Sequence, residues 1–307
     1  MLSEHTKGVF VISLTPFTGQ GEIDYASLDR LIEFYLEQGV HGLTVLGMMG
    51  EAHKMTGAEA EMLARRFLAG VAGRVPVIVG VSGTSLTAMR QLSRQAMDGG
   101  AAGAMIAPVA GLRTDDQLFG YYASVFEALG PDVPAVYQDY PQSTGVYLSV
   151  AVFNRMVREF PQLVMLKMED CPGLGKVTGV RQTAEREGLR RVSILVGNGG
   201  FYLPQSLARG ADGVMTGFAY PDMLVQVYER FAAGDHQGAE DLFDVYLPLV
   251  CYEQQPGYGL AVRKEILRRR GAIASAAVRA PGASLTADDL RELDALMARL
   301  ERKLSGR

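Results

Sequence analysis

Short apolar runs that alternate with amphipathic stretches constrain the fold of this chain more than any other feature. Each run is five or six residues long, is rich in Val, Ile and Leu, and lacks polar alternation. Such runs are typical of strands buried on both faces of a parallel sheet. The eight runs cover residues 9–14, 42–46, 76–81, 103–107, 134–138, 163–168, 192–196 and 212–216. Eight strands, each followed by a helix, predict an α/β fold of the (β/α)8 TIM barrel type rather than an open doubly wound sheet.

The stretches between the runs have the periodicity of amphipathic helices. In the first of them, Leu28, Leu31 and Ile32 begin an apolar stripe at helical spacing. Asp24 precedes the stripe as an N-cap, and Gly39 follows it where a left-handed C-cap belongs. Later stretches repeat this design, so we expect the helices to cover the outside of the barrel.

Beyond residue 234 the alternation of apolar runs and amphipathic stretches gives way to amphipathic stretches alone. It contains three helical stripes, within residues 242–249, 260–270 and 290–300. The sequence therefore predicts a catalytic barrel over residues 1–234 and a three-helix extension over residues 235–307. Residues 232–236 do not resemble a long flexible linker, so we expect the extension to pack on the barrel.

The charge balance argues against several classes of partner. The 307 residues include 30 Lys plus Arg and 34 Asp plus Glu, a net charge of -4, with no block of five or more like charges. A nucleic acid or a membrane surface would need a basic patch, so we expect neither as a partner. No apolar run approaches the ~18 residues of a membrane-spanning helix.

Cysteine and histidine usage indicates a metal-free protein. Cys171 and Cys251 are the only cysteines, too few for a disulfide framework or a thiolate zinc site. They suit a reducing compartment, and the polar N-terminus has no long apolar segment, which together indicate a cytoplasmic protein. His53 has no ligand partners at metal spacing. We therefore expect no metal site and no cofactor.

Lys167 is the most informative polar residue in the predicted strands. In a barrel the active site lies at the carboxyl ends of the strands, and Lys167 is near the end of the sixth. Alternation puts Met165, Lys167 and Glu169 on one face. If that face is the barrel interior, burial favours the neutral amine that a Schiff-base nucleophile needs. The alternative is a lysine that reaches water at the strand end or pairs with Glu169.

Glycine-rich turns follow the second and seventh runs. Gly47 opens the turn Gly-Met-Met-Gly-Glu, in which the backbone N–H groups of Met48 and Met49 could converge on a carboxylate. Gly197 and Asn198 open a second turn at the position of a recurrent anion site in barrels. Both segments also fit ordinary strand-to-helix turns.

These stretches together resemble the dihydrodipicolinate synthase and N-acetylneuraminate lyase superfamily, the pyruvate-type class I aldolases. The resemblance covers nearly the whole chain and includes the 47–51 turn, the 141–145 stretch, Lys167 and the segment 210–213. It implies that Lys167 forms an imine with a small-molecule 2-oxo acid whose carboxylate lies against Met48 and Met49. It also implies a homo-oligomer, either a tetramer or a dimer.

The sequence departs from the family pattern at the residues of its proton relay. Met48 and Met49 replace the usual Thr or Ser hydroxyls, and Gln138 takes the place of the usual tyrosine. A local shift could bring in Tyr137 or Tyr140 instead. Residues 108–110 lack the second relay tyrosine, and residues 142–143 lack the arginine that binds the second substrate of the synthases. Genuine dihydrodipicolinate synthesis is therefore disfavoured.

One branch of the superfamily has a pattern more similar to this one. The 2-keto-3-deoxy-pentonate dehydratases of the L-arabonate type share a Gln-Asp-x-Pro motif, here at 138–141, and a strand-six motif matched by Lys167, Glu169, Pro172 and Gly173. This resemblance predicts a dehydratase of a 2-keto-3-deoxy sugar acid.

The proton-transfer group and the reaction type stay open at this level. Glu169 is the first candidate base, because it follows Lys167 on the same face, and Tyr140, Tyr137 and Asp139 are further candidates. Met48 and Met49 could instead line a pocket for a less polar aldehyde, as in a pyruvate-dependent aldolase or hydratase-aldolase. A binding barrel that retains Lys167 without turnover is the third alternative.

Overall fold

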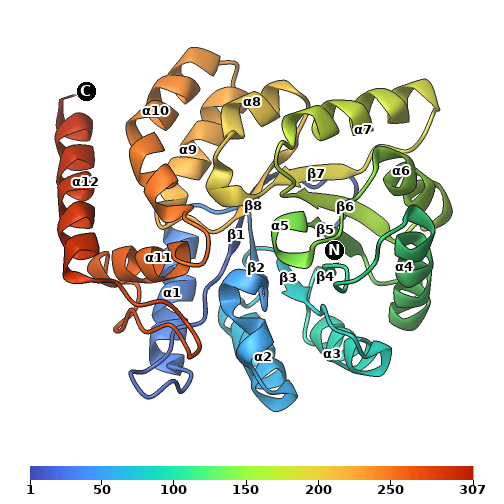
Figure 1. Ribbon diagram of the computed structural model, residues 1–307, viewed down its shortest axis with the longest axis horizontal. Coiled ribbons are helices and arrows are strands. Elements are labelled where there is room, and N and C mark those ends of the chain that lie inside the picture. The colour runs from blue at the N-terminus through green and yellow to red at the C-terminus, as the bar shows by residue number, and fades with distance from the viewer. Residues whose placement is uncertain (307) are drawn as a thin grey trace.

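The computed structural model describes residues 1–306, and within them eight parallel strands close into a barrel in chain order (Figure 1). This confirms the predicted fold class, and each strand lies within two residues of its predicted position. The strands are β1 (Gly8–Ile12), β2 (Gly42–Val45), β3 (Val77–Gly80), β4 (Gly103–Ile106), β5 (Ala135–Asp139), β6 (Leu163–Met168), β7 (Ser193–Val196) and β8 (Gly213–Thr216). Neighbouring strands pair in parallel all the way round, and β8 pairs with β1.

Helices surround the barrel, and their caps explain where they begin. The carboxylate of Asp24 accepts a hydrogen bond from the N–H of Ser27, and Gly39 follows the helix with φ +74°. The helices that follow successive strands are α1 (Tyr25–Glu37), α2 (Gly57–Val71), α3 (Leu86–Asp98), α4 (Asp115–Leu129), α6 (Val150–Glu159), α7 (Leu174–Arg186), α8 (Leu203–Ala208) and α9 (Pro221–Ala232). A short helix, α5 (Pro141–Thr144), lies between β5 and α6.

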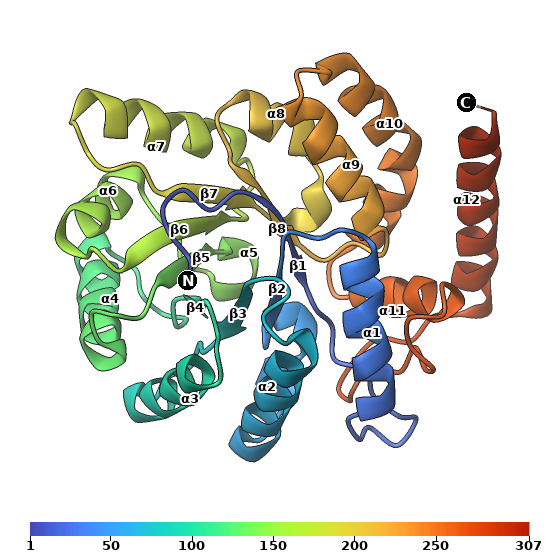
Figure 2. The same cartoon turned by 180° about the vertical axis from the view of Figure 1, so that it is seen from behind.

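Two apolar layers fill the molecule. The outward-facing strand residues pack against the helices in one large cluster. The inward-facing residues form a second cluster inside the barrel, namely Phe10, Ile12, Ile78, Met105, Val136, Met165, Leu195 and Met215. Leu2 joins this inner cluster, and its N–H donates to the carbonyl of Ala102 at the amino end of the strands. The N-terminus lies over that end in Figure 2, so the amino end is closed and the carboxyl end carries the opening.

Three helices follow α9 within the described part of the chain: α10 (His236–Glu253), α11 (Gly259–Arg269) and α12 (Ala287–Ser305). They form the predicted extension, and α10 packs against α9, α11 and α12. The exact division at residue 234 stays a prediction. Over residues 1–306, we find no helix with the length and apolar character that crossing a bilayer requires.

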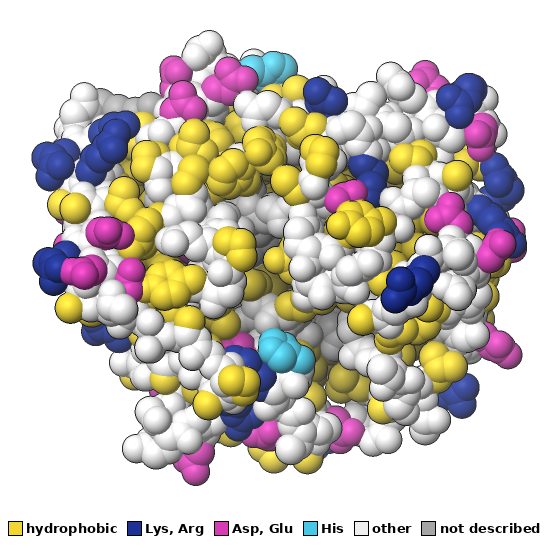
Figure 3. All heavy atoms as spheres, in the orientation of Figure 1, with side chains coloured by type: hydrophobic (Ala, Val, Ile, Leu, Met, Phe, Trp, Pro, Cys, Tyr) yellow, Lys and Arg dark blue, Asp and Glu magenta, His cyan; other side chains and the backbone are white. Residues whose placement is uncertain are grey.

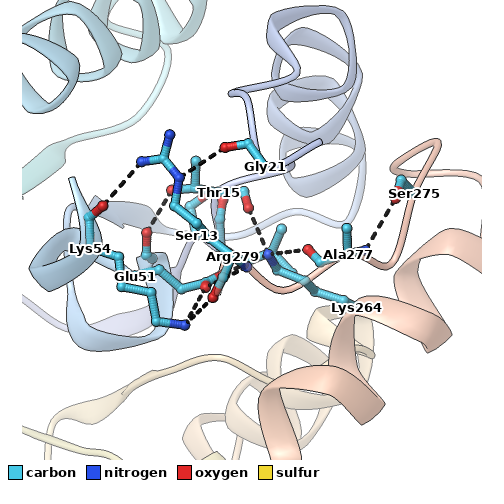
Figure 4. Close-up of polar contacts among 11 residues, drawn as sticks. Ser13, Thr15, Gly21, Glu51, Lys54, Lys264, Ser275, Ala277 and Arg279 are labelled. Carbon is cyan, nitrogen blue, oxygen red and sulfur yellow. Dashed lines mark hydrogen bonds and ion pairs between the residues drawn. The ribbon is translucent and has the colours of Figure 1, made fainter. Parts of the chain in front are cut away.

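A buried carboxylate, Glu51, joins the extension to the turn after β2. Glu51 has no exposed side-chain surface, and it accepts hydrogen bonds from Lys264 Nζ at 2.5 Å, Lys54 Nζ at 2.8 Å and the backbone N–H of Arg279 at 3.0 Å. Figure 4 shows Lys264 of α11 and Arg279 of the segment before α12 converging on Glu51, together with Lys54 from the turn itself. Lys264 Nζ also donates to the carbonyls of Thr15 and Ala277. All three ammonium protons thus have partners.

We expect Lys264→Met to lower the free energy of unfolding by about 3 to 5 kcal/mol, because it leaves the buried Glu51 carboxylate without its main counter-ion. Urea unfolding of wild type and variant measures the change. Arg66→Ala is the matched control, because the Arg66–Asp29 pair has 48% exposure on both side chains and exposed pairs contribute about 0 to 1 kcal/mol. An equal effect of the two substitutions would contradict the structural role given to Lys264.

Candidate active site

The face onto which the carboxyl ends of the strands open is hollowed near its centre (Figure 3). Lys167 lies on β6 two residues after Met165, whose side chain belongs to the inner cluster. Alternation therefore directs Lys167 into the barrel mouth, and its side chain is only 3% exposed. The structure thus rules out a lysine that reaches bulk water. It does form the ion pair considered from sequence, because Lys167 Nζ lies 3.0 Å from Glu169 Oε2.

Glu169 is held beside Lys167 by residues from the ends of the two neighbouring strands, β5 and β7. Gln138 Nε2, from β5, donates to Glu169 Oε2 at 2.8 Å. Asn198 Nδ2, just after β7, donates to the backbone carbonyl of Glu169 at 2.9 Å. Gly197 makes room for the carboxylate, since a Cβ at this position would lie 2.2 Å from Glu169 Cγ. The structure therefore brings these five predicted residues together at one side of the mouth.

Tyr140 is a further predicted residue, close enough to this group for the charge of Glu169 to act on its hydroxyl. It is half-buried and directly precedes α5. Burial raises the pKa of its hydroxyl, the negative charge of Glu169 raises it further, and the positive charge of Arg263 lowers it. The hydroxyl thus lies within electrostatic range of a carboxylate on β6 and a guanidinium on α11, and Tyr140 could donate a proton to a group between them.

Tyr137 does not belong to the site, which corrects the expectation from sequence. Because Gln138 faces the barrel interior, Tyr137 faces outward, where its ring stacks on Tyr122 with centroids 4.5 Å apart. Burial raises the pKa of the Tyr137 hydroxyl well above its usual range, so this group neither faces the mouth nor releases a proton readily. The residue packs in the layer between the barrel and α4.

The side chain of Asp139 also points away from the mouth. Its Oδ2 lies 2.7 Å from Lys176 Nζ on α7, and the same ammonium group lies 2.6 Å from Asp170 Oδ2. Lys176 therefore joins the ends of β5 and β6, whose residues Gln138 and Glu169 meet in the site. Asp139 is therefore linked to Glu169 and Gln138 through this bridge.

The turn after β2 leaves backbone N–H groups free at its start. Gly47 precedes a single 3-10 turn, η1 (Met48–Gly50), and supplies no side-chain cap. The first N–H groups of such a turn, those of Met48 and Met49, have no carbonyl partner within it. Met49 packs against the inner cluster, which directs this segment toward the mouth. Glu51 ends the turn in the left-handed region with φ 58°, where its ion pair with Lys264 holds it.

Sequence reasoning missed three charged residues near the site: Lys176, Arg263 and Lys264. Arg263 and Lys264 are buried on α11, and Lys176 is largely covered by Asp139 and Asp170. The sequence did contain one indication that Arg263 is buried. Arg263 lies beside Val262 and three residues before Ile266, on the apolar stripe of a helix. Within residues 1–306, no three His, Cys, Asp or Glu side chains are arranged so that they could hold a metal ion.

The sequence of this barrel matches the dihydrodipicolinate synthetase family over residues 5–300. The chain belongs to this family. The resemblance seen in the sequence is thereby confirmed, and the chain is a lyase of the dihydrodipicolinate synthetase family.

Relatives in the family carry two different activities. The chain is 34% identical over 301 residues to L-2-keto-3-deoxyarabonate dehydratase of Azospirillum brasilense, covering 96% of this chain and 94% of that one. It is 34% identical over 236 residues to 4-hydroxy-tetrahydrodipicolinate synthase of Sorangium cellulosum, covering 76% of each. Among solved structures, dihydrodipicolinate synthase from Rhodopseudomonas palustris superposes with a TM-score of 0.94 and 49% identity, over 97% of this chain and 99% of that chain.

The buried carboxyl of Asp139 predicts a specific pH dependence of stability. Burial raises its pKa to about 6, and the attraction of Lys176 only partly opposes this. Its pKa in the unfolded chain is ~3.9, so between these values the folded state binds more protons and the free energy of unfolding falls as the pH rises. We expect a loss on the order of 3 kcal/mol between about pH 4 and pH 7.

Denaturant unfolding of wild type and Asp139→Asn across this range measures the effect. Asp139→Asn should lack this fall in the free energy of unfolding between about pH 4 and pH 7. Asp132→Asn, at an exposed carboxyl, should keep the pH dependence of wild type. Identical pH profiles for wild type and Asp139→Asn would contradict the prediction.

Proposed function

We propose that this protein dehydrates a 2-keto-3-deoxy sugar acid through an imine formed by Lys167. The observation that carries the proposal is the buried contact of 3.0 Å between Lys167 Nζ and Glu169 Oε2 in the barrel mouth. When an amine forms an imine with C2 of a 2-oxo acid, the adjacent carbon C3 comes close to the residues that surround the amine. Glu169 is then within reach of a C3 proton.

Imine formation is the first half of the proposed reaction. The carboxylate of the 2-oxo acid binds at the N–H groups of Met48 and Met49, which orients C2 toward Lys167. The unprotonated amine attacks C2, and the resulting carbinolamine loses water to give the imine. Transfer of the Lys167 proton to Glu169 across their contact supplies the amine, and Glu169 returns this proton to the carbinolamine hydroxyl, which leaves as water. The protonated imine then withdraws electrons from the C2–C3 bond.

Glu169 acts as the base of the second half. It removes a C3 proton to give an enamine, and it returns a proton to the C4 hydroxyl, which leaves as water. A proton shift from C5 to C3 converts the unsaturated imine of a pentonate to the C5 enol, hence to the aldehyde. Hydrolysis then regenerates Lys167 and releases a 2-oxo acid semialdehyde. Gln138 keeps the Glu169 carboxylate in place throughout.

The similarity to the Azospirillum brasilense dehydratase over 96% of this chain supports dehydration over dihydrodipicolinate synthesis. A pyruvate-dependent aldolase or hydratase-aldolase is the second candidate, supported by the apolar side chain of Met49 at the mouth. Homo-oligomerisation, as a dimer or tetramer, and a cytoplasmic location are further parts of the proposal that rest on the family.

Borohydride reduction tests the first half of the reaction. With pyruvate or a 2-keto-3-deoxy-pentonate, intact-protein mass should increase by the reduced adduct in wild type, because the imine is trapped as a stable amine. Lys167→Ala should give no adduct, while Lys303→Ala, at an exposed lysine, should behave as wild type. The absence of adducts in wild type would refute the lyase mechanism.

Substitution of Glu169 separates the two halves. Glu169→Gln replaces the carboxylate by an uncharged amide of the same size and so removes the base. We expect the rate constant kcat for sugar-acid dehydration to fall about 10²- to 10⁴-fold. The borohydride adduct should form more slowly, because Glu169 also accepts the Lys167 proton, but it should reach the wild-type level after long incubation at high 2-oxo acid concentration. Product analysis distinguishes the reaction types, since dehydration yields a semialdehyde and aldol cleavage yields pyruvate plus an aldehyde. Unchanged kcat would exclude Glu169 as the base.

A further inference from the structure

The guanidinium of Arg263 on α11 is a buried cation with unused donors. Its side chain is 3% exposed, and its Nε donates to Glu253 Oε1. Glu253 is also buried and accepts from the backbone N–H of Ala219 through Oε2 at 3.1 Å. Among the residues that the structure describes, Arg263 Nη1 has no hydrogen-bond partner. A buried donor without a partner is costly, so its retention calls for an explanation.

Gly217 shows where this guanidinium lies. It follows Met215 by two residues on the β8 side of the barrel, and Met215 belongs to the inner cluster. A Cβ at Gly217 would lie 2.3 Å from Arg263 Nη1 and 3.2 Å from the carbonyl oxygen of Ile12. The guanidinium therefore occupies the space that a mouth-facing side chain after β8 would fill. Gly197 admits Glu169 in the same way after β7.

Arg263 also acts on Tyr140, which connects it to the group around Lys167. The positive charge of Arg263 lowers the pKa of the Tyr140 hydroxyl, against the effects of burial and of Glu169. Arg263 and Glu169 thus both lie within electrostatic range of one hydroxyl. Its position beside Gly217 and its action on Tyr140 put Nη1 at the carboxyl end of the barrel, the end at which Lys167 also lies.

We propose that Arg263 binds the hydroxyl-bearing tail of the sugar acid, beyond the carbon atoms that react. The inference rests on the proposed function and adds the residue that selects a polyhydroxy 2-oxo acid over pyruvate. Glu253 already balances the charge of Arg263, so its free N–H groups suit a neutral oxygen acceptor better than a second carboxylate. Pyruvate has no tail and leaves these donors unused.

The test compares two 2-oxo acids on the full-length chain. We would measure the concentration of pyruvate and of a 2-keto-3-deoxy-pentonate that gives half-maximal borohydride adduct, together with kcat/KM for dehydration. The variant is Arg263→Met combined with Glu253→Gln, which avoids leaving a buried charge unpaired. We expect a loss of about 10- to 100-fold in affinity and kcat/KM for the sugar acid. The value for pyruvate should stay within about 2-fold.

Gly217→Ala provides an independent steric variant. It keeps both charges, but its methyl group would displace Nη1 from the mouth, so it should reproduce the selective loss for the sugar acid. A loss of equal size for both 2-oxo acids, or no loss for either, would overturn the role of Arg263. If wild type forms no adduct with either acid, the proposed function itself fails and this inference fails with it. An adduct without dehydration would refute only the dehydratase, and the ratio of affinities would still test Arg263.

Discussion

The buried pair of Glu51 and Lys264 is the interaction on which the rest of the site depends. Glu51 ends the turn that follows β2, and Lys264 comes from α11, more than two hundred residues later in the chain. A carboxylate without exposed surface would be very unfavourable alone, but here three donors surround it. The pair therefore fixes the position of the N–H groups of Met48 and Met49 relative to the barrel. The C-terminal extension is in this sense part of the site.

Two glycines shape the mouth as much as the charged residues do. Gly197 and Gly217 each leave a space that a longer side chain from another element fills, Glu169 in one case and Arg263 in the other. At these two positions the ends of β7 and β8 thus contribute space rather than a side chain. The carboxylate that follows β6 and the guanidinium of α11 can occupy these spaces only because the two positions have no Cβ.

Much of this arrangement could be predicted from the sequence, because it depends on local periodicity. The eight apolar runs predicted the barrel, and alternation along β6 put Lys167 and Glu169 on its inner face. The same alternation argues against Tyr137 and Asp139, since both are neighbours of the inward-facing Gln138; the hypothesis of a local shift obscured this. Arg263 and Lys264 could not be predicted in the same way. Their burial depends on how α11 packs against the strand ends, which no local pattern encodes.

Closure of the barrel at its amino end leaves the carboxyl end as the side by which small molecules enter and leave. Leu2 lies against the inner cluster, and the backbone of Gly103 approaches it so closely that a Cβ there would lie 2.7 Å from its side chain. Among residues 1–306, the side chain of Leu2 thus fills the amino end of the barrel interior. In the proposed reaction, a 2-oxo acid bound at Lys167 would therefore obstruct the opening by which the next one arrives, so each product would have to depart before another substrate could enter.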